Sequence, residues 1–553
     1  MKNKILAISG GILIALSLTA CEYFMPLFGD SSDGGFNPFR PVSSSVEQAS
    51  IPSEYNNTSY PKGEIVAQKA SCTYDDYVQN SVYAISATPS VGNAKILVIP
   101  VWFSDSSTFI NESSKEKVRA DIENVYFGTD ASTGWKSVKT YYEQESFGSL
   151  NLTGTVSGWY EPGESYKNYG TDNTGAKTPA LVEKAAKWFF NNNPSEKRTD
   201  YDFDKDGYLD GVMLIYAAPD YVALGRDSYS NLWAYCYWTQ NYEAQSVINP
   251  AVNAFFWASY DFMYGSNTVS SRTGKLTGYA SGDTRYCTID AHTYIHEMGH
   301  MFGLEDYYDY SDNGYSPAGD FSMQDHNVGG HDPFSSFALG WGKAYIPQES
   351  MTINLKPFAS SGEMIILTPS WNTYNSPFDE YLILEYYTPT ELNAFDTGHK
   401  YLSRYPTGTT SSGIRLWHVD ARLLYITLLD QEFTADKATT NPRLGDNYGV
   451  ATMMSNTYDD GSSETRDYES LLGPSYANYN ILQLIRNNKN ATYKPSDSFG
   501  ESSLFMKGSY FDMSDYSRQF VNAGKLNSKK DLGYSFIIES VSSEEAVVSI
   551  IKK

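Results

Sequence analysis

The chain has 553 residues, of which 41% are hydrophobic and 19% charged, a composition typical of globular rather than disordered proteins. One hydrophobic core rarely serves so long a chain, so two or more domains are expected. The formal net charge of −24 repels phosphate backbones, and no nucleic-acid partner is expected. The four cysteines form no CxxC pair, which argues against a disulfide scaffold and against thiolate-bound zinc.

The N-terminus has the layout of an export signal. Two lysines precede an apolar stretch, residues 5–20, that is short for a membrane-spanning helix. The stretch ends at Leu18-Thr19-Ala20-Cys21, which resembles the lipobox of bacterial lipoproteins. The resemblance implies a signal peptide at 1–20, lipidation of Cys21, and a cell-surface protein held by its lipid on the outer face of a bacterial membrane. The alternative is an ordinary cleaved signal for secretion.

Residues 21–65 are rich in Gly, Ser, Pro and Asn and are predicted to be a flexible stalk or linker. A catalytic domain is expected at 66–345, because helical and strand patterns alternate there. Its strands are predicted at 94–103, 150–156 and 212–216, and its helices at 115–126 and 179–191.

From residue 346 onward, short alternating runs dominate and predict a β-rich domain at 346–553. The runs lie at 364–367, 381–386, 414–417, 536–539 and 546–551. The predicted fold class is therefore α+β, a catalytic domain followed by a β-sandwich-like C-terminal domain.

An acidic loop within the catalytic region predicts a structural calcium ion. Carboxylates at alternate positions around a glycine turn can surround a hard cation, and a backbone carbonyl adds one more oxygen. The expected ligands are Asp202, Asp204, Asp206, Tyr208 (through its carbonyl) and Asp210. Met213 occupies the twelfth position, so the loop is not a complete EF-hand, and a solvated acidic turn is the alternative.

A predicted helix carries His296, Glu297 and His300. Residues four apart share one helix face, so the two histidines can bind one zinc ion together. Glu297 lies beside that ion, where it can act as general base toward zinc-activated water. Asp290 is expected to cap the helix, and Gly303 to end it in a left-handed turn.

That turn can bring Asp306 back to the metal as third ligand, leaving a fourth position open for water. His326 and His331 are rival third ligands, and both are also candidates for the group that stabilises the oxyanion. By contrast, Cys236 and His418 are interpreted as structural residues.

The pattern HExxHxxGxxD, met by His296, Glu297, His300, Gly303 and Asp306, resembles the immune inhibitor A metallopeptidases, peptidase family M6. The segments 141–150, 333–341 and 413–420 also resemble that family. The resemblance implies a zincin- or metzincin-like catalytic domain, with Met323 as a methionine turn that packs beneath the metal. It also implies a zinc endopeptidase that hydrolyses extracellular proteins or peptides. The alternative is a catalytically silent surface binding or adhesion lipoprotein on the same scaffold.

Overall fold

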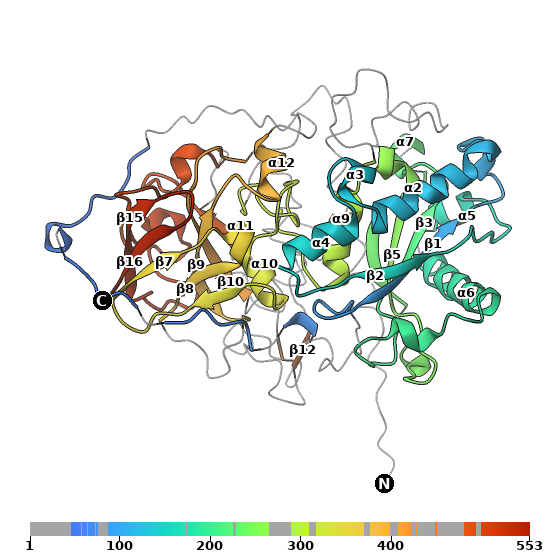
Figure 1. Ribbon diagram of the computed structural model, residues 1–553, viewed down its shortest axis with the longest axis horizontal. Coiled ribbons are helices and arrows are strands. Elements are labelled where there is room, and N and C mark those ends of the chain that lie inside the picture. The colour runs from blue at the N-terminus through green and yellow to red at the C-terminus, as the bar shows by residue number, and fades with distance from the viewer. Residues whose placement is uncertain are drawn as a thin grey trace, which may run out of the picture.

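The computed structural model places two lobes side by side, one around β1–β5 and the other around β7–β16 (Figure 1). It describes residues 46–56, 58–63, 65–71, 73–75, 87–172, 175–224, 228–239, 241–264, 289–308, 317–369, 377–398, 408–421, 426–427, 448–450, 480–493 and 499–553. The predicted signal peptide and the predicted lipidation site Cys21 lie outside these residues, as do Cys72 and Cys287. Among the described residues, no helix is long and apolar enough to cross a membrane.

The first lobe is built on a five-stranded sheet in the order β2-β1-β3-β5-β4. Its strands are β1 (Lys95–Val101), β2 (Thr153–Val156), β3 (Val212–Tyr216), β4 (Tyr235–Trp238) and β5 (Ala254–Ser259). All pair in parallel except β4, which runs antiparallel at the edge. Every side chain of β3 and β5 is buried, as expected for central strands of a sheet covered on both faces.

Four longer helices accompany this sheet: α2 (Lys115–Phe127), α4 (Val138–Glu145), α6 (Lys177–Asn192) and α9 (His292–Met301). Helix α4 starts at a capping box in which Ser137 and Thr140 satisfy each other's backbone amides. It packs against both α2 and α9, and α9 in turn lies against β4 and β5. The shorter helices are α3 (Asp130–Thr133), α5 (Lys167–Gly170), α7 (Tyr221–Leu224), α10 (Pro333–Ala338), α11 (Phe358–Ser361) and α12 (Asn393–Thr397).

The second lobe contains two larger sheets. The sheet β13-β10-β9-β8-β6 comprises β6 (Lys343–Tyr345), β8 (Glu363–Leu367), β9 (Glu380–Tyr387), β10 (Gly413–Asp420) and β13 (Leu482–Ile485). The sheet β14-β15-β16-β7 is antiparallel and comprises β7 (Met351–Leu355), β14 (Tyr510–Asp512), β15 (Tyr534–Val541) and β16 (Ala546–Lys552). A separate pair joins β11 (Ile426–Thr427) to β12 (Tyr448–Val450).

The sheet around β9 and β10 is apolar on both faces, because alternate side chains of a strand point to opposite sides. One set of its side chains belongs to the same core as the first lobe: Ile366, Tyr381, Ile383, Trp417, Val419, Leu482 and Leu484. The other set joins the core shared with β7 and β14–β16: Ile365, Leu367, Leu382, Leu384, Tyr386, Ile414, Leu416 and Ile485. This sheet is therefore the layer through which the two lobes are packed together.

The described part of the segment predicted to be a flexible stalk packs along the second lobe. Gly63 donates its backbone amide to the Thr352 carbonyl at 3.1 Å, and Gln68 and Ala344 exchange two backbone hydrogen bonds. Four side chains of the segment rest on the second core: Ile51, Tyr55, Tyr60 and Ile65. Figure 1 shows these first described residues, in blue, beside β15 and β16. The structure thus differs from the stalk expected here, because the apolar side chains spaced along a polar segment find a core.

The predicted α+β class is confirmed in its coarse form, and the strong apolar runs are strands as expected. The run predicted at 212–216 is β3, and those predicted at 381–386 and 546–551 are the cores of β9 and β16. The helices predicted at 115–126 and 179–191 are α2 and α6, within two residues at each end.

Candidate metal centre

Helix α9 ends where the sequence predicts, at a left-handed glycine. Gly303 has φ of 99°, and the amides of Gly303 and Leu304 donate to the carbonyls of His300 and Gly299. The start differs by one residue, since Ala291 is the N-cap, but the Asp290 carboxylate still accepts a hydrogen bond from the His292 amide at 2.9 Å. The reversal after Gly303 returns the chain toward the helix face that carries the two histidines.

Both histidines are fixed in one tautomer by backbone carbonyls. His296 Nδ1 lies 2.7 Å from the Met323 carbonyl, and His300 Nδ1 lies 2.8 Å from the Leu304 carbonyl. A carbonyl only accepts, so each Nδ1 carries the hydrogen and donates. Each Nε2 is then the atom that offers a lone pair to a metal, as in zinc sites whose histidines are oriented by outer hydrogen bonds.

Three ligand atoms converge beside this helix. His296 Nε2 and His300 Nε2 are 3.2 Å apart, and Asp306 Oδ1 lies 3.1 Å from the first and 3.3 Å from the second. Tetrahedral zinc with bonds of about 2.0–2.1 Å requires ligand atoms separated by about 3.3 Å. The spacing and the two-imidazole, one-carboxylate donor set both fit a zinc ion with one further position open.

The three ligands are at most 9% exposed, so they interact strongly. Burial lowers and the Asp306 carboxylate raises the pKa of His300, with a net value of about 10. In return, burial raises and His300 lowers the pKa of Asp306, which is about 2. The carboxylate therefore stays ionised at every physiological pH, which is the state a metal ligand needs.

Glu297 is 1% exposed and lies against Cys236 of β4. The Cys236 thiol donates to the Glu297 carbonyl at 3.0 Å and lies 3.9 Å from its carboxylate oxygen Oε2. Burial, and next the Glu297 carboxylate, hold the pKa of the thiol well above its usual value, so the sulfur keeps its proton. This contact was not predicted, and no local sequence pattern announces it, because the two residues are 61 positions apart.

The loop containing Met323 contacts the metal-binding helix through His296. The Met323 side chain is fully buried and packs, while its carbonyl orients His296. The backbone carbonyl of the next residue, Gln324, accepts a hydrogen bond from the Tyr307 amide. The Gln324 side chain packs against Gly299 of the helix. A Cβ on Gly299 would lie 2.2 Å from Gln324 Oε1, so glycine at this position is required by the close approach.

The rival third ligands, His326 and His331, are not in this group of three. His326 Nδ1 lies 2.7 Å from Asp325 Oδ1 and belongs to a separate group with Asp320 and Asp325. His331 Nε2 lies 3.4 Å from the Tyr142 hydroxyl. In the described part of the chain, Asp306 is the residue brought to the histidine pair.

The acidic loop brings together three of its five predicted ligands. Carboxylate oxygens of Asp202, Asp204 and Asp210 lie within 4.8 Å of one another. Asp206 is not in this group, and its Oδ1 accepts the Tyr208 amide at 2.7 Å. The turn uses left-handed backbone at Lys205 (φ 62°) and Gly207 (φ 90°). Tyr208 forms a β-bridge with Ala251, which ties the loop to the chain entering β5.

Burial raises the pKa values of three carboxyl groups in this loop, those of Asp202, Asp206 and Asp210. Burial, and next the neighbouring aspartates, raise the pKa of Asp202 to about 6 and that of Asp206 to about 7. Burial raises that of Asp210 to about 8, although the Lys95 and Phe203 amides donate to it. Such a cluster is one that a cation would stabilise in its ionised form.

His418 has a structural environment. Its Nε2 lies 3.0 Å from Glu380 Oε1 on the neighbouring strand, and both side chains are buried. Glu380 also accepts the amides of Asn527 and Ser528, so the pair joins β9 and β10 to the chain before β15.

A helix with two histidines and an adjacent glutamate, and an aspartate returned by a glycine turn, together form a metal site of the kind that metalloproteases use. Comparison with known proteins agrees. Residues 84–325 match the family "Immune inhibitor A peptidase M6, catalytic domain". The chain is also 25% identical over 311 residues to "Pre-pro-metalloprotease PrtV" from two strains of Vibrio cholerae serotype O1, M66-2 and ATCC 39315. The match covers 47% of this chain and 31% of each relative, so the chain spans well under two thirds of their length.

Proposed function

We propose that the protein is a zinc endopeptidase that cleaves extracellular proteins while its lipidated Cys21 holds it at the outer face of a bacterial membrane. One observation carries the catalytic part: His296 Nε2, His300 Nε2 and Asp306 Oδ1 lie 3.1–3.3 Å apart, next to Glu297. The similarity of residues 84–325 to M6 catalytic domains supports the same activity. The export signal and the lipobox-like Leu18–Cys21 support the location.

A zinc ion bound by the three side chains would supply Lewis-acid activation of a water molecule and of the substrate carbonyl. Glu297, one position round the helix from His296, accepts the proton of the attacking water and returns it to the leaving amine. The Met323 and Leu304 carbonyls keep both imidazoles in the orientation that ligation requires.

The edge strand β4 offers a place for the substrate backbone. It pairs with β5 on one side, and no described strand pairs with its other edge. An extended peptide could add to that edge by backbone hydrogen bonds. Because β4 also carries Cys236 against Glu297, such a peptide would run close to the general base.

Two further assignments complete the proposal. The acidic loop would bind a structural calcium ion through Asp202, Asp204 and Asp210, supported by their grouped oxygens and by the raised pKa values of Asp202 and Asp210. The sheets of the second lobe, with a core between them, would form a β-sandwich-like domain.

The test is cleavage of denatured casein by the full chain, beside Glu297→Ala and with zinc measured in both. Bound zinc in both proteins with cleavage lost in Glu297→Ala is the expected result. Zinc-free protein without activity would contradict the proposal and favour a surface binding protein.

A further inference from the structure

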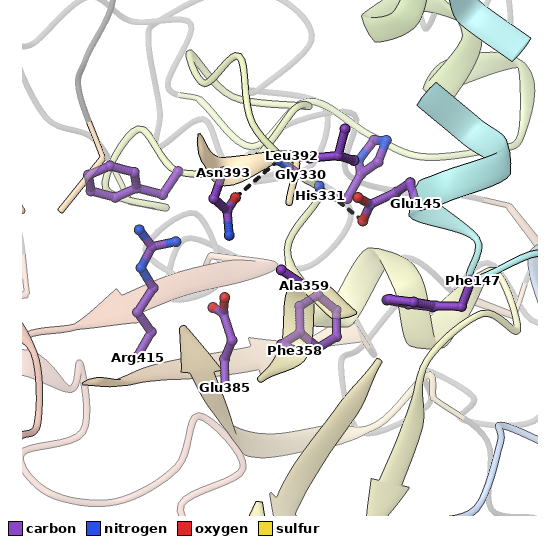
Figure 2. A pocket seen from close by; sticks show the side chains of 11 residues that line it. Glu145, Phe147, Gly330, His331, Phe358, Ala359, Glu385, Leu392, Asn393 and Arg415 are labelled. Carbon is purple, nitrogen blue, oxygen red and sulfur yellow. Dashed lines mark hydrogen bonds between the residues drawn. The ribbon is translucent and has the colours of Figure 1, made fainter. Parts of the chain in front are cut away.

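A small cavity lies between the two lobes, on the first-lobe side of the β9–β10 sheet (Figure 2). Helix α4 contributes Glu145, the strands contribute Glu385 and Arg415, and α12 contributes Asn393. Three phenylalanines add apolar wall: Phe147, Phe321 and Phe358. The free space has room for about one water molecule, so any occupant must be small.

Arg415 is a buried cation that makes no hydrogen bond or ion pair with the described residues. It is 3% exposed, and its Nε and Nη2 are buried without a hydrogen-bond partner. These two nitrogens form one edge of the guanidinium, the edge that binds an acceptor with two parallel N–H groups. An arginine cannot lose its charge at physiological pH, so this burial carries a cost until an acceptor is present.

The carboxylate opposite Arg415 on the neighbouring strand has a different hydrogen-bond partner. Glu385 is the direct partner of Arg415 across the β9–β10 ladder, yet Glu385 Oε2 accepts the Trp417 indole N–H at 2.8 Å. The guanidinium lies 3.6 Å from the ring centre of Tyr387 and 4.4 Å from that of Phe321. These rings fix the plane of the guanidinium, and the indole fixes the carboxyl group. In Figure 2 the two side chains rise side by side from neighbouring strands.

Burial shifts the pKa of the other titratable groups around Arg415 toward their neutral forms. Burial raises the pKa of Glu145 to about 8 and that of Asp396 to about 7. Burial also raises the pKa of Glu385, against the opposing effect of Arg415, and raises that of Tyr387 to about 12. Burial lowers the pKa of His331 to about 3. Asp332, behind this layer, is buried with a raised pKa as well.

We propose that this cavity is a binding site for a monatomic halide, chloride under physiological conditions, seated on the Nε–Nη2 edge of Arg415 between the two lobes. The size of the cavity excludes larger anions such as sulfate, and the guanidinium excludes a cation. The Asn393 amide, whose nitrogen donates one hydrogen to the Thr388 carbonyl, also lines the cavity and has a second N–H to offer.

Binding of the anion is coupled to protons. As the pH rises above about 7, Asp396 and then Glu145 ionise. The negative charge that these groups then carry competes with the halide for Arg415. Halide affinity therefore falls with rising pH, and below that pH the halide stabilises the contact between the lobes.

The direct test is bromide in place of chloride in crystals of the full chain grown at about pH 6. An anomalous peak within hydrogen-bonding distance of Arg415 Nε and Nη2 is expected. If crystals in saturating bromide show no anomalous peak there and only the density of a water molecule, the proposal is overturned.

A solution test uses thermal melting at constant ionic strength, with chloride replacing gluconate at about pH 6 and about pH 9. Chloride should raise the melting temperature by roughly 2 °C or more at the lower pH and by less at the higher pH. Arg415→Lys keeps the charge but loses the two-nitrogen edge and should lose the response, whereas Arg518→Gln, on the surface, should keep it. An equal response in wild type and Arg415→Lys would contradict the site, and if Arg415→Lys does not fold, the bromide peak in the wild type decides.

Discussion

The histidine site and the acidic loop were both predicted as metal sites from the spacing of their residues. In the structure, all three predicted ligands converge at the histidine site, but only three of five do so in the acidic loop. At the histidine site, the helix fixes two ligands and a glycine turn returns the third, so all three converge. In the acidic loop, three carboxylates converge, while Asp206 turns to the Tyr208 amide. A rigid helix transmits sequence spacing directly into geometry, whereas aspartates in a turn are also drawn to nearby backbone amides.

The two sites also differ in charge. The histidine site is an ion pair that is stable without a metal, since Asp306 has a pKa of about 2 and His300 one of about 10. The acidic loop is a cluster of carboxyl groups, among which the pKa values of Asp202, Asp206 and Asp210 are raised to between about 6 and about 8. Loss of a cation should therefore affect activity at the first site and stability at the second.

The largest effect is expected for Glu297→Gln, which keeps the size of the side chain but removes the base. The specificity constant kcat/KM should fall by about 10²–10⁴, with bound zinc unchanged. Rates on a fluorogenic peptide together with metal analysis measure this. Retention of more than a tenth of the wild-type rate would mean that another group takes the proton.

Zinc affinity should depend on His300 and Asp306, not on His326. His300→Ala and Asp306→Ala each remove a ligand, so zinc affinity should fall by more than the roughly 10–100-fold typical of outer-shell changes. His326→Ala is the matched control and should bind zinc as the wild type does, because His326 pairs with Asp325 instead. Competition with a chromogenic chelator measures all three. If only His326→Ala lost zinc, His326 rather than Asp306 would be the third ligand.

Calcium removal should lower stability in a pH-dependent way. The folded pKa values of Asp202, Asp206 and Asp210 lie above their unfolded values near 4, so the folded state binds protons more tightly. In EGTA this stabilisation is complete below about pH 4 and is lost as the pH rises through about 6–8. With calcium the loss should be much smaller. Melting curves across pH measure the difference, and curves that coincide with and without calcium would remove the ion from this loop.

A much smaller effect is expected for Met323→Leu. The side chain only packs, and His296 is oriented by the Met323 carbonyl, which the substitution keeps. A swap of similar volume should cost less than about 1.5 kcal/mol and leave kcat/KM within a few-fold. A loss as large as that of Glu297→Gln would show that the sulfur itself has a part in the chemistry.

Much of the fold followed from the sequence where local pattern decides structure. The apolar runs of β3 and β16, the α2 face and the turn at Gly303 all depend on residues close together in the chain. Tertiary contacts decided the rest. The stalk-like composition before residue 65 did not reveal four apolar side chains resting on a distant core. Nor could spacing show that Cys236 contacts Glu297, or that Arg415 stacks on two rings while Glu385 accepts a hydrogen bond from an indole.

The β9–β10 sheet, apolar on both faces, has a consequence for how the molecule unfolds. A chain ending at residue 345 would leave the first-lobe core without Ile383, Trp417 and Leu484, all of them fully buried. Because the same strands also complete the second core, neither lobe can melt without exposing apolar surface of the other. Heat or denaturant should therefore unfold both lobes in one cooperative transition, and the first lobe should aggregate when expressed alone.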